Sequence, residues 1–227
     1  LIALQINNWN ESQKDRKAEN KALISLKQEF DENDKLLNKL LIIRKKQEKQ
    51  GRTYLQLITD ETIPITQKIA ASTLDINNSI WGVTNTVLNG LVNSGGIDRI
   101  QNDSLKVLLS NWPNLVDRFK KYEERYIESV RNLEDYENAI IPRPVVKNGN
   151  YSHKWPGNYY PNSMDKRLAP LRKDLIKDIK YYNLIGTMTN DLYGSLVLGT
   201  DLRNDYKRIS QLIIKELNYR GIHPPGN

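Results

Sequence analysis

The sequence predicts an all-α protein, built as an antiparallel bundle of long helices with short, broken helices in the middle of the chain. Two observations lead to this fold class. In three long segments, apolar residues recur at intervals of three and four, which is the spacing of an amphipathic helix. No segment long enough to form a strand shows the alternation of apolar and polar residues that is typical of one. Because a helix cannot bury an apolar stripe alone, the long helices must pack on one another.

The first long helix is expected from Asn7 to Gln50, because this segment contains neither proline nor glycine and Gly51 follows it. Its apolar stripe consists of Leu23, Leu26, Phe30, Leu37, Leu40 and Leu41. The pattern resumes weakly after Gly51, and Pro64 then marks a turn or a new helix start. Shorter helices are expected over 65–71 and 84–92, before the stop signal of two consecutive glycines at 95–96.

A second long helix is predicted to start near Leu105, after a cap formed by residues 102–104. Pro113 has no backbone N–H, so we expect a kink or a fresh helix start there. The third long helix is predicted over 171–217. Three glycines lie within it: Gly186, Gly194 and Gly199. Small residues at such spacings allow neighbouring helices to approach closely.

Charge and composition limit the classes of function that this protein can have. The formal net charge is +7, which favours anionic neighbours such as lipid head groups, nucleic acid or acidic proteins. The charges are interspersed along the helices and no nucleic-acid-binding motif is present, so we expect a solvated helical surface and no nucleic-acid partner. Cysteine is absent, which excludes a disulfide framework, a thiolate zinc site and a cysteine nucleophile.

No residue pattern supports catalysis, so we expect a non-enzymatic protein without a cofactor or a metal. His153 and His223 lack a third nearby ligand and the spacing of a metal motif. Carboxylate pairs such as those at 123–124 and 31–32 lie in charged helical runs. Catalytic carboxylates need a cleft that separates their pKa values, whereas these pairs are expected on solvated helix faces.

One loop is the candidate recognition site. The segment 148–163 is rich in glycine, proline and aromatic residues and joins the second and third long helices. The aromatic residues that we select are Tyr151, Trp155, Tyr159 and Tyr160. Such a loop can hold a peptide, a sugar or a partner helix. The alternative, which we favour, is that its rings fold back and cover the end of the bundle, because large aromatic side chains are usually buried.

The amino-terminal residues predict a membrane anchor. An apolar opening, LIALQI, is followed by NNWNE, and Trp9 suits the membrane–water interface. We therefore expect residues 1–6 to be the end of a truncated transmembrane helix, 7–222 to be a helical-bundle domain outside the cytoplasm, and 223–227 to be a tail.

The segment 1–11 resembles the membrane exit of a Bacteroidota family of short, single-pass membrane-anchored proteins, a domain of unknown function. The segments 91–100, 102–105 and 112–113 are similar to the middle of the same family. The resemblance implies an N-terminal transmembrane helix, an exposed helical domain and no catalytic residues. A basic tail upstream in the family implies an inner-membrane protein whose domain lies in the periplasm. Lys14, Arg16 and Lys17 favour the opposite orientation, because positive charge beside a span favours the cytoplasm.

Two functions follow from these expectations. The first is a sensor or protein-interaction module at the membrane, because long helices that leave a span can transmit a displacement or dock a partner. The second is a structural scaffold that self-associates through its long helices as a coiled coil, which the length of the first helix suggests. The partners expected are therefore the membrane, through the missing N-terminal helix, and either an unknown protein or a second copy.

Overall fold

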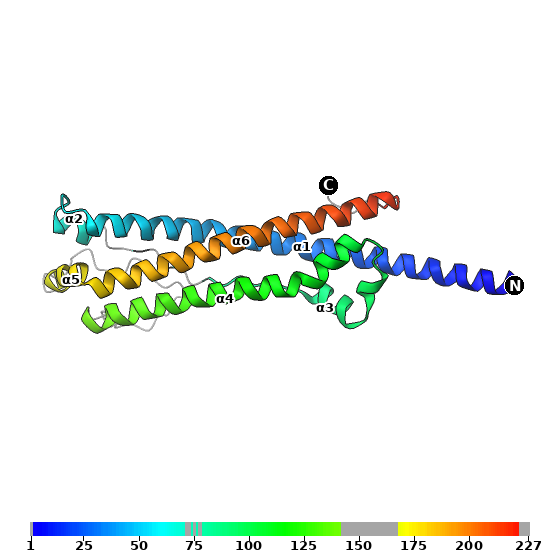
Figure 1. Cartoon of the computed structure of the whole chain (residues 1–227), viewed down its shortest axis with the longest axis horizontal. Helices are drawn as coiled ribbons and strands as arrows, with labels where there is room; N and C mark the ends of the chain where they lie inside the picture. The colour runs from blue at the N-terminus through cyan, green and yellow to red at the C-terminus, as the bar shows by residue number, and fades with distance from the viewer. Residues whose placement is uncertain (1, 71–73, 75, 77–78, 142–167, 223–227) are drawn as a thin grey trace, which may run out of the picture. The chain divides into compact units, whose positions relative to one another are not determined.

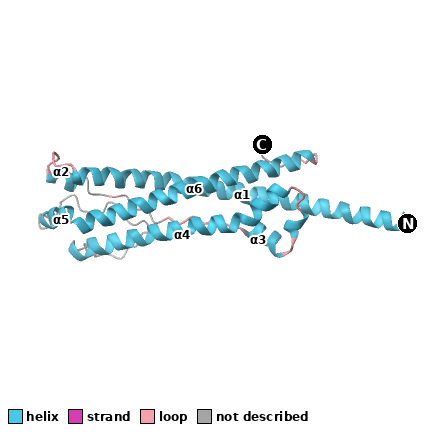
Figure 2. Ribbon diagram, viewed as in Figure 1, coloured by secondary structure: helices cyan, strands magenta, loops and turns pink. Residues whose placement is uncertain are grey.

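The computed structural model describes residues 2–70, 74, 76, 79–141 and 168–222. Within these residues the chain forms helices and no strand, so the predicted all-α bundle is confirmed (Figures 1 and 2). The elements in order are α1 (Ile2–Thr59), α2 (Ile65–Ala70), α3 (Thr86–Asn93), a 3₁₀ turn η1 (Gly96–Arg99), α4 (Asp103–Ile140), α5 (Leu168–Lys177) and α6 (Ile179–Tyr219).

The described chain divides into two compact units. The first comprises residues 1–40, 81–119 and 198–227, and the second comprises residues 41–80 and 120–197. Helices α1, α4 and α6 contribute residues to both units, whereas α2 and α5 belong to the second and α3 and η1 to the first.

The core of the first unit contains the stripe predicted for the first helix. Leu23, Leu26, Phe30 and Leu37 are all buried. An aromatic cluster continues this core, in which the Trp112 ring centroid lies 4.9 Å from that of Phe30 and 4.3 Å from that of Tyr206. Trp81 and Phe119 add a further edge-to-face pair at 5.4 Å. Such rings bury large areas and dominate the stability of a core.

Buried polar side chains of α1 hold the segment around α3. The Glu29 carboxylate accepts hydrogen bonds from the backbone N–H groups of Val87 (2.7 Å) and Leu88 (3.1 Å). Asn85 precedes the helix without making a side-chain cap, so Glu29 satisfies the free N–H groups of its first turn. Asn33 exchanges hydrogen bonds with Thr84, donating to the carbonyl at 2.6 Å and accepting from the N–H at 3.1 Å.

Gly51 lies inside α1, and the prediction that the first helix ends at Gln50 is wrong. In the second unit a Cβ atom at this position would overlap the Thr189 side chain on α6 and lie 3.3 Å from its Cβ. The glycine therefore permits a close approach of two helices, and the pattern weakens there because a side chain is absent. Close packing of two helices, and not a turn, therefore explains why a glycine occupies position 51.

The start of α4 agrees with the predicted cap. Asn102 accepts a hydrogen bond from the Leu105 N–H at 2.9 Å through its side chain, and the helix begins at Asp103. Pro113 lies inside α4, so no new helix starts at this proline. Figure 1 shows a change of direction in the amino-terminal part of the helix, as expected where a proline removes a backbone hydrogen bond.

The last predicted helix is two helices. Helix α5 ends at Lys177 and α6 begins at Ile179, with Asp178 between them. Asp178 accepts a hydrogen bond from the Lys180 N–H at 2.7 Å through its side chain and from the Tyr182 N–H at 3.1 Å through its carbonyl. The aspartate thus caps α6, which explains the break that the apolar spacing did not reveal.

The glycines of α6 differ in what they contact, which gives a first prediction. A Cβ at Gly194 would lie 2.8 Å from two ring carbons of Tyr122 on α4, whereas one at Gly186 would meet nothing within 4 Å. We expect Gly194→Ala to lower the free energy of unfolding by about 1–3 kcal/mol through overpacking. Gly186→Ala should raise it by about 0.5–1 kcal/mol, because alanine favours a helix.

Urea unfolding of the two variants and the parent measures both effects. Equal effects of the two substitutions would contradict the close packing of α6 against α4 at Gly194.

Candidate functional site

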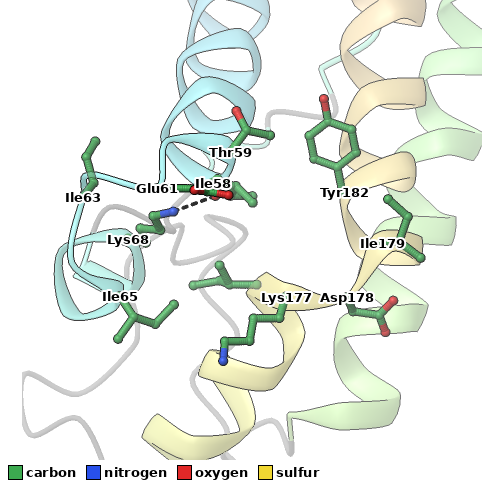
Figure 3. Close-up of a pocket in the computed structure, with 11 residues that line it drawn as sticks. Ile58, Thr59, Glu61, Ile63, Ile65, Lys68, Lys177, Asp178, Ile179 and Tyr182 are labelled. Atoms are coloured by element: carbon green, nitrogen blue, oxygen red, sulfur yellow. Dashed lines mark hydrogen bonds between the residues drawn. The ribbon is translucent and has the colours of Figure 1, made fainter.

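A pocket of about 520 Å³ lies in the second unit, where α1 ends, α2 begins and α5 meets α6. Figure 3 shows its side chains arranged around the junction of these four helices. The lining residues are Ile58, Thr59, Glu61, Ile63, Ile65, Lys68, Ile176, Lys177, Asp178, Ile179 and Tyr182. Pockets of this volume are the usual size for small ligands.

The end of α1 forms one side of the pocket. Asp60 Oδ1 accepts hydrogen bonds from the Thr62 N–H (2.9 Å) and hydroxyl (2.6 Å), which turns the chain immediately after the helix. These two bonds, the one from the hydroxyl first, lower the pKa of Asp60. The Pro64 carbonyl then accepts the N–H groups of Gln67 (2.9 Å) and Lys68 (3.2 Å), so α2 starts directly after the proline.

Lys68 is the buried one of the charged residues that line the pocket. Its side chain donates a hydrogen bond of 2.7 Å to the Ile58 carbonyl, one of the last carbonyls of α1 (Figure 3). Carbonyls at a helix end have no partner within the helix and carry partial negative charge, so an ammonium is favourable beside them. Lys68 is only 8% exposed, which is unusual for a lysine.

The junction of α5 and α6 forms the opposite side. The Tyr136 hydroxyl of α4 donates a hydrogen bond to Asp178 Oδ2, and the Lys180 amine lies 4.5 Å from the Tyr136 ring centroid. The Tyr136 hydroxyl and then the Lys180 N–H lower the pKa of Asp178, while the bond to Asp178 raises the pKa of Tyr136. Both carboxylate oxygens of Asp178 therefore already accept a hydrogen bond.

Isoleucines supply most of the remaining lining. Ile176 is buried, Ile58, Ile63 and Ile65 are half-buried, and Ile179 is 70% exposed at the rim. The arrangement can hold a small molecule that has both an apolar part and a group complementary to an ammonium. Sequence reasoning missed this site, because its residues come from four helices and form no motif in the sequence.

A second polar centre of the same unit is closed to solvent. Arg44 of α1 is fully buried and pairs with Glu123 of α4, with 2.7 Å between Nη2 and Oε2. Arg44 also donates hydrogen bonds to Gln47 Oε1 (3.0 Å) and to the Ser79 carbonyl (2.7 Å). Ser195 of α6 donates its hydroxyl hydrogen bond to Glu123 Oε1. The cluster thus joins three helices of the unit through one ion pair.

The expected solvated face at 123–124 is therefore wrong for Glu123, which is 4% exposed, and holds for the exposed Glu124. A signal for Glu123 exists in the sequence. It lies at the three-and-four spacing between Phe119 and Tyr126, which are both buried residues of the α4 stripe. A charged residue at a stripe position indicates a buried pair rather than a solvated face.

Two buried tyrosines predict sensitivity to alkali. Burial, and then the nearby Glu137 carboxylate, raises the pKa of Tyr181; burial, followed by Asp34 and Glu29, raises the pKa of Tyr206. In the unfolded chain both ionise near pH 10, roughly their ordinary pKa. Above that pH the unfolded state binds fewer protons than the folded state, so the stability present below about pH 10 is lost as the pH rises.

Melting temperatures measured between neutral and strongly alkaline pH test this prediction. A variant carrying both Tyr181→Phe and Tyr206→Phe should lose less stability over the alkaline range than the parent. Equal pH dependence in the two proteins would show that other groups cause the alkaline loss.

The structure places one residue of the sequence-predicted sites. Trp9 lies on α1 and is 63% exposed. The aromatic loop residues Tyr151, Trp155, Tyr159 and Tyr160 lie outside the described residues, as do His153 and His223. Among the residues that are described, no group of three or more histidine, aspartate or glutamate side chains could hold a metal ion.

Trp9 belongs to a segment of α1 that we call the α1 stalk, residues 6–18. Every stalk side chain that the structure describes is exposed except Gln13, which is half-buried. The first buried side chain of the helix is Glu19, which is paired with Arg220 at 2.7 Å. Figure 1 shows the stalk, in dark blue, extending past α3.

None of the helices within the described residues combines the length and the apolar character that a membrane crossing requires. Comparison with protein-family models, with curated proteins and with solved structures finds no match to this chain.

Proposed function

We propose that this protein is a non-enzymatic, membrane-anchored helical domain that acts as a sensor or protein-interaction module. The observation that carries the proposal is the α1 stalk. Its side chains are exposed, and it includes Ile6 at 55% and Trp9 at 63% exposure. A helix of roughly a dozen residues without packing is only marginally stable in water. A helix that continues upstream into a membrane would stabilise it, with Trp9 at the interface.

The buried carboxylates support a role without catalysis. Glu19 accepts hydrogen bonds from Arg220 (2.8 Å) and the Gln101 N–H (3.2 Å). Glu29 caps α3, and Glu123 pairs with Arg44. Each of these groups is bound to a structural partner, whereas a general acid or base must reach a substrate.

Hydrogen exchange tests the stalk. We expect the backbone amides of residues 7–18 to exchange quickly in this chain, because few side-chain contacts stabilise the helix there. The amides near Leu26 and Phe30, which are buried, are the internal control and should exchange slowly. Equally slow exchange in both segments would mean that the stalk is packed, and the proposal of a free stalk would then fail.

The second candidate function is a scaffold that self-associates through its long helices. Ile6 and Trp9 favour it, because they lie one turn apart on the exposed stalk and could pair with a second copy. The molar mass of the chain in solution separates the two functions. A monomer at all concentrations contradicts the scaffold. A dimer that Trp9→Lys dissociates supports it.

The side of the membrane is a further part of the proposal. We expect the helical domain in the periplasm of an inner-membrane protein. Protease added to spheroplasts should therefore digest the domain. Resistance of the domain, together with digestion after lysis, would place it in the cytoplasm, as Lys14, Arg16 and Lys17 favour.

A further inference from the structure

We infer that the pocket at the end of α1 binds a small amphipathic organic anion, whose anionic oxygens meet the Lys68 ammonium and whose apolar part lies on the isoleucines. The inference deepens the sensor half of the proposed function by naming the class of ligand. The binding itself does not depend on the membrane anchor.

Lys68 has hydrogen-bonding capacity that the described residues do not fill. An ammonium has three donors, and among the described residues Lys68 uses one of them, on the Ile58 carbonyl at 2.7 Å. The residue as a whole is 8% exposed, and it lines the pocket. An unmet donor on a buried cation costs free energy that an anionic oxygen would recover.

Two other buried cations, Lys27 and Arg44, each have a carboxylate partner. Lys27, at 9% exposure, pairs with Asp31 at 2.6 Å. Arg44, which is fully buried, pairs with Glu123 at 2.7 Å. Lys68 makes no such ion pair with a carboxylate in the part of the chain that is described. Since buried charges in proteins are normally paired, an anion bound from solvent would give Lys68 the partner that the described residues do not supply.

The described carboxylates near the pocket form no ion pair with Lys68, although, beside the Thr62 hydrogen bonds, the Lys68 charge contributes a little to the lowered pKa of Asp60. Asp60 accepts both Thr62 hydrogen bonds, and Asp178 is held by Tyr136 and the Lys180 N–H. Figure 3 shows the Asp178 carboxylate directed away from Lys68, at the α5–α6 junction. Glu61 is exposed and forms no ion pair with Lys68, so it acts as a weak competitor at the rim.

Apolar side chains line the pocket beside the Lys68 charge. Ile58 lies in the last turn of α1, Ile63 in the turn that follows and Ile65 at the start of α2, and Ile176 of α5 and Ile179 of α6 complete the apolar lining. A volume of about 520 Å³ accommodates a short alkyl chain beside the ammonium.

Of the four charged residues that line the pocket, Lys68 is the buried one, whereas Lys177 and Glu61 are exposed and Asp178 is half-buried. A buried charge beside apolar side chains is typical of a site that fixes the orientation of a ligand.

Titration calorimetry of the chain tests the inference with four probes: hexanoate, hexyl phosphate, hexanol and hexylammonium. We expect at least one anion to bind tenfold or more tightly than hexanol, and hexylammonium to bind most weakly. A preference for hexanoate identifies a carboxylate ligand and a preference for hexyl phosphate a phosphate ligand. Equal affinity for the anions and hexanol, or no binding of either anion, overturns the inference without reference to any variant.

Substitutions then test whether Lys68 supplies the positive charge that binds the anion. Lys68→Met keeps the apolar stem and should reduce the preference for the anion over hexanol at least tenfold, whereas Lys68→Arg should restore most of it. Lys207→Met, at an exposed position of α6 in the first unit, is the matched control and should change nothing. Glu61→Gln should tighten anion binding. If the circular dichroism of Lys68→Met matches the parent and its preference is unchanged, Lys68 is not the anion site.

These results remain separate from the membrane proposal. If the chain binds hexanoate through Lys68 but is not held at a membrane, the ligand site is supported and the membrane anchor is contradicted. If the protein is membrane-anchored but binds none of the probes, the anchor is supported and the ligand site is contradicted.

Discussion

Arg44→Ala should lower the free energy of unfolding by about 3–5 kcal/mol, because it leaves the Glu123 carboxylate buried without its cation. Arg44 is fully buried and Glu123 is 4% exposed. The substitution also removes the hydrogen bond to the Ser79 carbonyl and the stacking of the guanidinium on Tyr126, whose ring centroid lies 4.3 Å from Cζ. Urea unfolding followed by circular dichroism measures the loss.

A double variant provides the control for this prediction. Arg44→Met together with Glu123→Leu replaces both charges by apolar groups of similar size. It should recover most of the stability that Arg44→Ala loses, since apolar replacements of a buried pair are often neutral. A loss below about 1 kcal/mol for Arg44→Ala would be typical of an exposed ion pair and would contradict the buried cluster.

The second large effect is expected in the core of the first unit. Leu26 is fully buried, so Leu26→Asp removes its packing and places a charge where it has no partner. We expect a loss of about 4 kcal/mol or more, with unfolding of much of the chain at room temperature. The melting temperature and the urea midpoint both report this loss.

Leu36→Asp is the matched control for Leu26→Asp. Leu36 lies on the same helix and in the same unit but is 44% exposed. Its substitution should cost about 1 kcal/mol or less, because the carboxylate can reach water. If Leu26→Asp melted at the temperature of the parent, the position of α1 in the core would be wrong.

The fold class was predictable from the sequence because the apolar stripes follow directly from helix geometry. Leu23, Leu26 and Phe30 repeat at three and four, and all three are buried. Gly51 was misread because glycine has two opposite uses, to stop a helix and to let another helix approach. Only the position of Thr189 on α6 decides between them.

The break at Asp178 and the burial of Glu123 were missed for a different reason. The break at Asp178 is capped locally, and Glu123 lies in the apolar stripe of α4, but the side chains that hold both residues are distant in the sequence: Tyr136 bonds to Asp178 and Arg44 pairs with Glu123. Local charge patterns cannot reveal a partner that arrives only through tertiary packing. Lys68 is a similar case, since its burial results from the meeting of α1, α2, α5 and α6 around the pocket.

Trp9 was selected from the sequence as a membrane-interface residue, and its 63% exposure on the α1 stalk agrees with an accessible position. The membrane contact itself remains a prediction. Candidate recognition residues of the aromatic loop, such as Trp155, remain predictions as well, because that loop lies outside the described residues.

Alkaline carbonate extraction of the natural protein from its own membranes tests the proposed anchor most directly. Carbonate releases proteins that are held at the surface, and it leaves proteins with a spanning helix in the membrane pellet. We expect this protein to stay in the pellet and to be released only by detergent, with a peripheral membrane protein as the control for release. Its recovery in the carbonate supernatant would contradict a membrane-anchored domain.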